Sequence, residues 1–170
     1  MIYTIGHSTH SADAFLALLR MHGVTQLADV RTMPMSRRHP HFNRDSLEKF
    51  LAASGLHYRH FGGLGGLRKP KRDSTNTAWK HPSFRGYADY METEAFERAF
   101  RQLATFASEG PTAVMCAEAV WWRCHRQLLA DALLVQGVPV WHIVGADAKL
   151  HEMSAFARIL EGKVIYPALL

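Results

Sequence analysis

The feature that most constrains this chain is an alternation of short apolar runs with longer stretches of helical period. Five runs rich in Val, Ile and aromatic residues are predicted strands, and they span residues 2–5, 26–30, 57–61, 112–116 and 138–144. Strands that alternate with helices form parallel sheets covered on both faces. The sequence therefore predicts an α/β fold: a mainly parallel five-stranded sheet in a Rossmann-like or flavodoxin-like three-layer sandwich.

Capping residues and glycines delimit the helices expected between these strands. The first three begin near a polar side chain that can accept a backbone hydrogen bond, and all four end at a glycine. The expected helices run from Ser11 to Gly23, from Asn43 or Asp45 to Gly55, from Thr93 to Gly110 and from about Arg123 to Gly137.

Length and composition favour one globular domain over residues 1–170. The chain is 48% hydrophobic and 21% charged, has no repeat, and contains no apolar run long enough to cross a membrane. The opening MIYTIGHSTHSADAF has no basic region followed by an apolar core, so we expect a cytoplasmic protein with no membrane partner. Two cysteines eight positions apart are too few for a disulfide scaffold, and we expect free thiols.

Positive charge is concentrated in one part of the chain. The net charge is +5, yet the segment from Arg31 to Arg72 carries ten Lys or Arg against Asp45 and Glu48, a local balance of +8. Clustered positive charge attracts phosphates and carboxylates. The segment is therefore either an anion-facing surface or a solvated basic loop.

The expected topology brings several polar groups to one edge of the sheet. Ligands of open parallel sheets bind outside the carboxyl ends of the strands. The first predicted strand leads into His7 and Ser8, the second into Asp29 and Arg31, and the fourth into Cys116 and Glu118, while His125 and Arg126 open the last helix. We expect this edge to hold the functional site.

Each of these residues has a proposed role and a plainer alternative. Cys116 is a nucleophile whose pKa is lowered by the helix that follows, or a small buried hydrophobe. Glu118 and His125 transfer protons, or serve as a helix cap and a structural imidazole. Asp29 orients Arg31 towards an anion, or the two form a plain ion pair.

Several other patterns near this edge are weaker. The spacing of Cys116 and Arg123 narrowly misses that of a phosphatase loop, and the glycines of residues 62–66 match no phosphate-binding fingerprint. A zinc site at Cys116, Cys124, His125 and His7 is disfavoured because the spacing fits no compact pattern and adjacent side chains of one helical turn diverge. We therefore expect no metal and no cofactor.

Two long connections follow carboxyl ends of strands, at residues 32–42 and 62–84. Both are basic and rich in Gly or Pro, and such loops in compact domains are commonly functional or disordered. Either loop can close over a bound anion as a lid or remain part of the solvated surface.

The motifs TIGHS (4–8), DVR (29–31) with Pro34, LGG (64–66), CAE (116–118) and CHR (124–126) together resemble the domain of unknown function 488 family. The resemblance extends to FRGY (84–87), Met91 and the closing Tyr166 and Pro167, and so covers nearly the whole chain. It implies an α/β fold with the motifs gathered at one edge, in a bacterial or archaeal protein, and it implies no particular reaction.

The preferred hypothesis is an enzyme of unassigned reaction that acts on a small anionic or nucleotide-like substrate. Arg31 and Arg126 hold the anion, His7 and Ser8 add hydrogen bonds, Glu118 or His125 moves protons, and Cys116 is the nucleophile or part of the pocket wall. One alternative is a nucleic-acid-binding module that uses the basic segment for phosphates and Trp79, Trp121 or Trp122 for stacking. Another is a thiol-based redox or metal sensor. The oligomeric state stays open.

Overall fold

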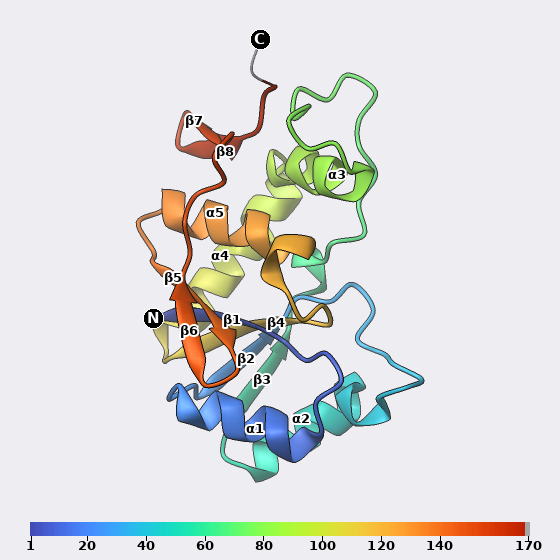
Figure 1. Cartoon of the computed structure of the whole chain (residues 1–170), viewed down its shortest axis with the longest axis vertical. Coiled ribbons are helices and arrows are strands. Elements are labelled where there is room, and N and C mark those ends of the chain that lie inside the picture. Colours follow the sequence, from blue (N-terminus) through green and yellow to red (C-terminus); the bar gives the residue numbers. More distant parts are fainter. Residues whose placement is uncertain (169–170) are drawn as a thin grey trace.

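A computed structural model describes residues 1–168, which are built around one six-stranded sheet (Figure 1). Its strand order is β3-β2-β4-β1-β5-β6, and the first five of these strands run parallel while β6 pairs antiparallel with β5. The strands are β1 (Ile2–Gly6), β2 (Gln26–Asp29), β3 (His57–His60), β4 (Thr112–Cys116), β5 (Val140–Val144) and β6 (Asp147–Leu150).

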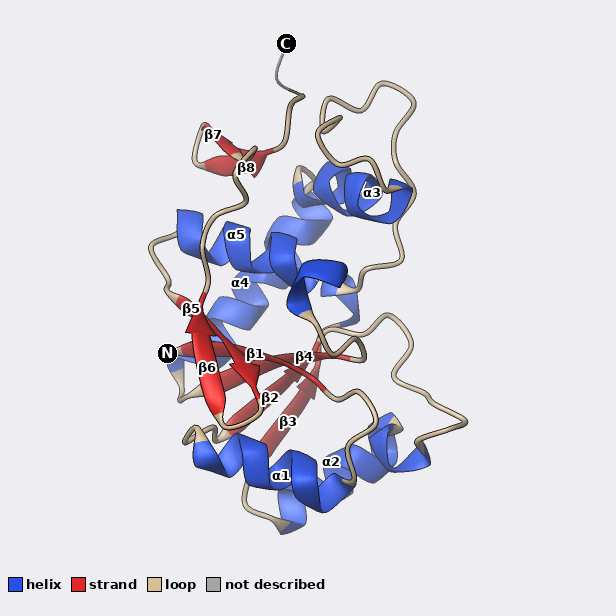
Figure 2. Ribbon diagram, in the orientation of Figure 1, coloured by secondary structure: helices blue, strands red, loops and turns tan. Residues whose placement is uncertain are grey.

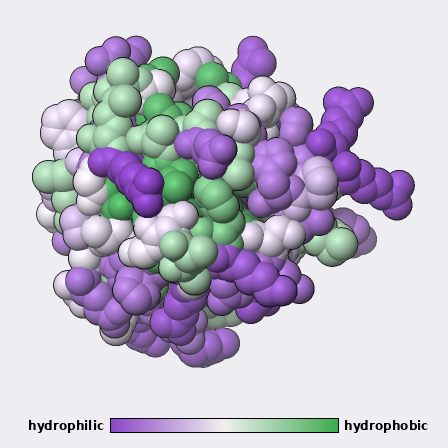
Figure 3. All heavy atoms as spheres, turned by 90° about the horizontal axis from the view of Figure 1, so that it is seen from below, coloured by the Kyte–Doolittle hydropathy of each residue, from purple (hydrophilic) through white to green (hydrophobic). Residues whose placement is uncertain are grey.

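Helices cover both faces of this sheet (Figure 2). Two helices, α1 (Ala12–Met21) and α2 (Arg44–Ala53), lie on one face, which is the side seen in Figure 3, where hydrophobic residues gather in the middle and hydrophilic ones surround them. On the other face lie α4 (Glu94–Ser108) and α5 (Arg126–Val135), with α3 (Pro82–Met91) packed against them. Each face has its own buried apolar cluster. The predicted α/β class with a mainly parallel, doubly covered sheet is confirmed.

The path of the chain after each strand determines where a ligand can enter. The connections after β1 and β2 lead to α1 and α2 on one face, whereas the connection after β4 leads to α5 on the other face. Because β4 lies between β1 and β2, the chain diverges on both sides of its carboxyl end. Such divergence leaves a crevice outside the strand ends, which is the usual ligand position in open α/β sheets.

The helices agree with their predicted caps, with one correction. Ser11 caps α1 and Thr93 caps α4, each by accepting a backbone hydrogen bond, and Asn43 is the residue before α2. The last helix does not begin near Arg123, because Trp121–Arg123 forms a separate 3-10 turn, η3, and α5 starts three residues later. Two further 3-10 turns are η1 (Pro40–Phe42) and η2 (Gly62–Leu64).

Several elements were not expected from the sequence. Helix α3 carries Gly86 in its interior, a poor helix former, but a Cβ at that position would collide with the carbonyl of Arg68. The close approach of the preceding loop therefore explains why a glycine stands inside the helix. The same glycine is why the sequence did not predict a helix here. The short strands β7 (Arg158–Leu160) and β8 (Lys163–Ile165) form a separate hairpin, and β6 makes the sheet one strand larger than predicted.

The long connection that precedes α3 is tied down from the helix. The buried carboxylate of Asp89 accepts hydrogen bonds from the Lys71 backbone (2.8 Å), the Ser74 hydroxyl (2.6 Å) and the Asn76 amide (2.9 Å). Asn76 in turn accepts from the backbone N–H of Tyr166 at 2.9 Å. This connection is thus a fixed part of the structure, joined to the C-terminal segment.

Within residues 1–168, no helix is both long enough and apolar enough to span a membrane.

Candidate functional site

A cavity of about 970 Å³ opens at the carboxyl ends of β1, β2 and β4, where the chain diverges. Six of the eight predicted site residues line it. They are His7 and Ser8 after β1, Arg31 after β2, Cys116 and Glu118 at the end of β4, and His125 at the start of α5. Asp29 and Arg126 lie behind the cavity wall, because both are almost completely buried and contact other protein groups.

Arg31 is held in one orientation by Asp29. Its Nε lies 2.9 Å from Asp29 Oδ1 and its second terminal nitrogen 2.6 Å from Oδ2, a two-point pairing that fixes the plane of the guanidinium. The Phe42 carbonyl accepts a further bond at 2.8 Å, and Tyr58 donates its hydroxyl to Asp29 at 2.7 Å. The other terminal nitrogen of Arg31 is not used by these contacts. It lies on the side of His7 and the cavity.

His7 is a neutral imidazole of defined tautomer. Its Nδ1 donates to the Ser8 carbonyl at 3.0 Å, so Nε2 is free to accept from Arg31 at 3.4 Å. Burial lowers the pKa of His7 to about 4, and the neighbouring Arg31 charge acts in the same direction. The ring also stacks on Phe42 with the ring centres 4.2 Å apart. At neutral pH the cavity therefore presents an uncharged, immobile histidine beside a fixed cation.

The loops after β1 and β4 are joined to each other. The backbone N–H groups of His7 and Ser8 donate to the carbonyls of Cys116 and Ala117 at 2.9 and 3.0 Å, which extends the parallel ladder past the strand ends. Gly6 is required here because a Cβ would collide with the Glu118 backbone. Ser8 adopts a left-handed conformation (φ 46°), which is uncommon for a non-glycine residue.

The glycines of the LGG loop (64–66) are explained by close packing. Gly66 lies against the ring of His125 so closely that a Cβ would collide with it, and Gly65 lies equally close to Thr32. The loop therefore brings residues 65–66 across the mouth of the site and presses on the imidazole. This contact explains why glycines are needed without any ligand.

Arg126 points into the protein instead of into the cavity. Its side chain is 1% exposed, and one terminal nitrogen donates to the backbone carbonyls of Glu118 and Ala119. Its Nε donates to the sulfur of Cys124 at 3.4 Å. Arg126 thus holds the β4–α5 loop in place and lies next to the sulfur of Cys124. The sequence had instead led us to expect Arg126 at the anion.

Both thiols lie in the wall between β4 and α5. The sulfur atoms of Cys116 and Cys124 and a ring nitrogen of His125 lie within 4.8 Å of one another, and both cysteines are free. A hydrogen bond from the Cys116 thiol lowers the pKa of Cys124 well below its usual range, assisted by His125 and by the Arg126 charge. The same hydrogen bond, together with burial, raises the pKa of Cys116.

The lowered pKa was expected at Cys116 and is found at Cys124. The reason is the partners: Cys124 accepts the hydrogen bond from Cys116 and also contacts His125 and Arg126, whereas Cys116 is the donor of that bond. The expectation that Cys124 and His125 diverge is also wrong. The backbone at Cys124 is extended rather than helical, which places its sulfur 3.6 Å from His125 Nδ1.

The Domain of unknown function DUF488 family model matches residues 11–133, which is most of the chain. The chain belongs to this family. The matched range includes Arg31, Cys116, Glu118 and His125 but begins after His7. Comparisons with curated proteins and with solved structures found no match.

The mouth of the cavity in this DUF488 protein combines charge with exposed apolar side chains. Glu118 is exposed, and the one hydrogen bond of its carboxylate within residues 1–168 is a long 3.3 Å contact from the Val120 backbone, so the carboxylate is available. Arg123 is exposed on the same rim. The apolar members of the rim are Met33, Met35, Leu67 and Trp122, each more than half exposed. The mouth thus offers both polar and apolar contacts.

The three tryptophans considered for stacking differ in availability. Trp79 packs among Phe84, Phe156 and Tyr166. Trp121 stacks on His142 with ring centres 4.4 Å apart. Trp122 is 52% exposed at the cavity mouth and is the one of the three that can meet a ligand there.

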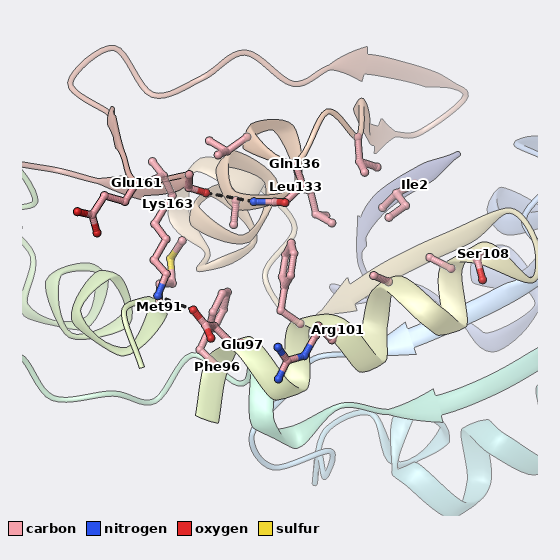
Figure 4. A pocket seen from close by; sticks show the side chains of 18 of the residues that line it. Ile2, Met91, Phe96, Glu97, Arg101, Ser108, Leu133, Gln136, Glu161 and Lys163 are labelled. Atoms are coloured by element: carbon pink, nitrogen blue, oxygen red, sulfur yellow. Dashed lines mark hydrogen bonds and ion pairs between the residues drawn. The ribbon is translucent and has the colours of Figure 1, made fainter. Parts of the chain in front are cut away.

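A second cavity of the DUF488 chain, of about 700 Å³, lies between α4, α5 and β8 (Figure 4). Its walls are mainly apolar, with Phe96 and Leu133 among them. Some of its polar groups are paired, Glu97 with Lys163 and Gln136 with the Gly162 carbonyl at 3.1 Å, and Arg101 and Glu161 also line it. The cavity differs from the one at the strand ends in holding neither cysteine nor histidine among its lining residues.

Proposed function

We propose that this DUF488 chain is a cytoplasmic enzyme that binds a small anionic or nucleotide-like substrate in the cavity at the carboxyl ends of β1, β2 and β4. One observation carries the proposal: a roughly 970 Å³ cavity gathers Arg31, His7, Cys116, Glu118 and His125 from three separate strand ends. Cavities of this size that hold a few convergent polar groups are typical of small-molecule sites.

Arg31 provides the anion site in this proposal. Asp29 supplies two hydrogen-bonded oxygens, so the guanidinium is oriented before a ligand arrives and loses little freedom on binding. His7 is neutral at pH 7 in the absence of ligand because its pKa is lowered to about 4, so Arg31 carries the positive charge at this point of the cavity. A phosphate or carboxylate beside Arg31 then gains a charge-assisted hydrogen bond in a partly buried setting.

The remaining residues of the cavity supply proton transfer and a thiol nucleophile. Glu118 is exposed at the rim with one long contact from the Val120 backbone, which suits a proton acceptor, and His125 Nδ1 lies 3.6 Å from the sulfur of Cys124. Ser8 adds a hydroxyl from the β1 loop. Arg126 becomes a positioning residue in this proposal, because its contacts hold the loop that carries Glu118.

Calorimetric titration with inorganic phosphate, adenosine 5′-monophosphate and adenosine tests the proposal. We expect the two anions to bind and adenosine alone to bind far more weakly. Arg31→Lys removes the two-point pairing with Asp29 and should weaken phosphate binding by about 10-fold or more, since a charge-assisted hydrogen bond contributes about 1.5–3 kcal/mol.

The matched control is Arg38→Lys, an exposed arginine of the same connection that does not line the cavity. Its phosphate affinity should equal that of the wild type. The proposal fails if no anion binds to the wild-type protein, or if Arg38→Lys weakens binding as much as Arg31→Lys does.

The second candidate is a nucleic-acid-binding module, favoured by the exposed Trp122 beside the basic β2 connection. Arg37 and Arg38 are exposed on that connection, and Trp122 offers a stacking surface at the cavity mouth. Gel-shift assays at low salt test it: binding that weakens steeply with salt and is reduced in Trp122→Ala supports this candidate. Absence of binding to single- and double-stranded nucleic acid removes it.

A further inference from the structure

The buried guanidinium of Arg126 needs an anion, and a thiolate is the group in position to provide it. Arg126 is 1% exposed and forms none of the ion pairs with a carboxylate found in residues 1–168. Its partners are two carbonyl oxygens and the sulfur of Cys124. Burying an unpaired charge is very costly, so the negative partner of Arg126 is the ionised Cys124.

The surroundings of Cys124 agree with a thiolate. The sulfur lies 3.6 Å from His125 Nδ1 and directly before the N-terminus of α5, where helix N–H groups favour negative charge. Tyr87 packs on the ring of His125 with ring centres 5.0 Å apart, and its raised pKa keeps its hydroxyl neutral. The groups that face Cys124 are therefore Arg126, His125, the neutral Tyr87 and the Cys116 thiol.

A divalent cation fits this cluster poorly. Cys116, Cys124 and His125 are close enough to act as three ligands. Two thiolates would neutralise a zinc ion, however, and Arg126 would then be a buried cation without an anion. One thiolate and one protonated thiol balance the single positive charge of Arg126 without any metal.

We propose that Cys124 and Cys116 act as a dithiol that reduces a small anionic disulfide, with Cys124 as nucleophile and Cys116 as resolving thiol. Both cysteines line the cavity. The choice of an anionic substrate rests on the anion site proposed above at Arg31, whereas the dithiol itself rests on the contacts of Arg126.

The reaction has two steps. In the first, the Cys124 thiolate attacks one sulfur of the substrate, forms a mixed disulfide and releases the other half as a thiolate. In the second, Cys116 loses its proton and attacks Cys124, which forms the Cys116–Cys124 disulfide and releases the second half as a thiolate. Two electrons pass from the protein to the substrate, one proton is released, and an external thiol restores the dithiol.

The probe is 5,5′-dithiobis(2-nitrobenzoic acid), a disulfide with two carboxylates that releases a coloured thiolate, used at pH 6. Roughly 1% or less of an ordinary thiol is ionised at this pH, so fast reaction identifies a thiol of lowered pKa. We expect two coloured thiolates per wild-type chain, and peptide mass analysis should find Cys116 joined to Cys124.

The two single substitutions assign the roles. Cys116→Ser should release one thiolate quickly and retain the other half as a mixed disulfide on Cys124, and Cys124→Ser should react at least 10-fold more slowly. A mixed disulfide on Cys116 in Cys124→Ser, formed as fast as in the wild type, would overturn the assignment. The peptide analysis of the wild type tests the dithiol even if a variant does not fold.

A neutral probe, 2,2′-dithiodipyridine, separates this inference from the proposed anion site. Faster reaction with the anionic probe supports both. Equal rates with both probes, with two leaving groups still released from each, keep the dithiol and overturn the anionic substrate class. Slow reaction of both thiols at pH 6, or reaction only after a chelator is added, overturns the dithiol and leaves phosphate binding at Arg31 unaffected.

Discussion

Two buried polar clusters of this protein are built alike and end differently. In one, Asp29 accepts from Arg31 and Tyr58, and Arg31 leads to His7 at the cavity. In the other, Asp131 accepts hydrogen bonds from His151 at 2.8 Å and from Tyr166 at 2.8 Å. In each cluster a buried carboxylate accepts a hydrogen bond from a tyrosine hydroxyl. The same carboxylate also binds a first nitrogen-containing side chain, Arg31 or His151, which contacts a histidine in turn.

The Asp131 cluster is closed at its far end. His151 contacts His142 at 2.9 Å, and His142 ends the chain at the Thr4 hydroxyl, 2.6 Å away. Trp121 covers the ring of His142. All of its members are satisfied by one another, and none lines the cavity at the strand ends. The comparison teaches that a buried polar cluster suggests chemistry only where one end is left open to a ligand.

The largest expected effect is on folding, in Asp131→Ala. The substitution leaves the buried donors of His151 and Tyr166, and the partly buried hydroxyl of Ser154, without their acceptor, so we expect the free energy of unfolding to fall by about 3–5 kcal/mol. Urea denaturation measures it. The phosphate affinity of the folded protein should stay at the wild-type value, because the closed cluster does not reach the cavity. A loss below about 1 kcal/mol, or weaker phosphate binding, would contradict the comparison.

A smaller effect is expected from a matched pair of tyrosine substitutions. Tyr58→Phe and Tyr166→Phe each remove one hydroxyl donor, to Asp29 at 2.7 Å and to Asp131 at 2.8 Å. Each should lower the free energy of unfolding by about 1.5–3 kcal/mol. Tyr58→Phe should in addition weaken phosphate binding severalfold, because Asp29 orients Arg31. Equal phosphate affinities in the two variants would show that the two clusters do not differ in this respect.

The sequence was sufficient to predict which residues gather at the strand ends. Apolar runs located the strands, and the rule for parallel sheets then placed His7, Arg31 and Glu118 on one edge. The role of Arg126 was not predictable, because the 3-10 turn over Trp121–Arg123 decides where α5 begins and which way that side chain points. For the same reason Cys124 was overlooked in favour of Cys116.

The closed cluster had no local sequence signal at all. Asp131, His142 and His151 come from α5, β5 and the chain after β6, and only the tertiary fold brings them together. Helix α3 was missed for a related reason. The glycine at position 86 is required by the loop that packs against the helix at Arg68, although glycine has a low helix propensity.

Nuclear magnetic resonance of the histidine rings between pH 7 and pH 5, with and without phosphate, tests the central claim most directly. Burial lowers the pKa of His7 to about 4 and that of His142 to about 3, so both rings should stay essentially neutral in the absence of ligand. A phosphate held by Arg31 favours the protonated form of the neighbouring His7. The account therefore predicts that phosphate raises the pKa of His7, so that its ring titrates between pH 7 and pH 5. The ring of His142 should show no change. A His7 ring that is indifferent to saturating phosphate, or a His142 ring that responds equally, would contradict it.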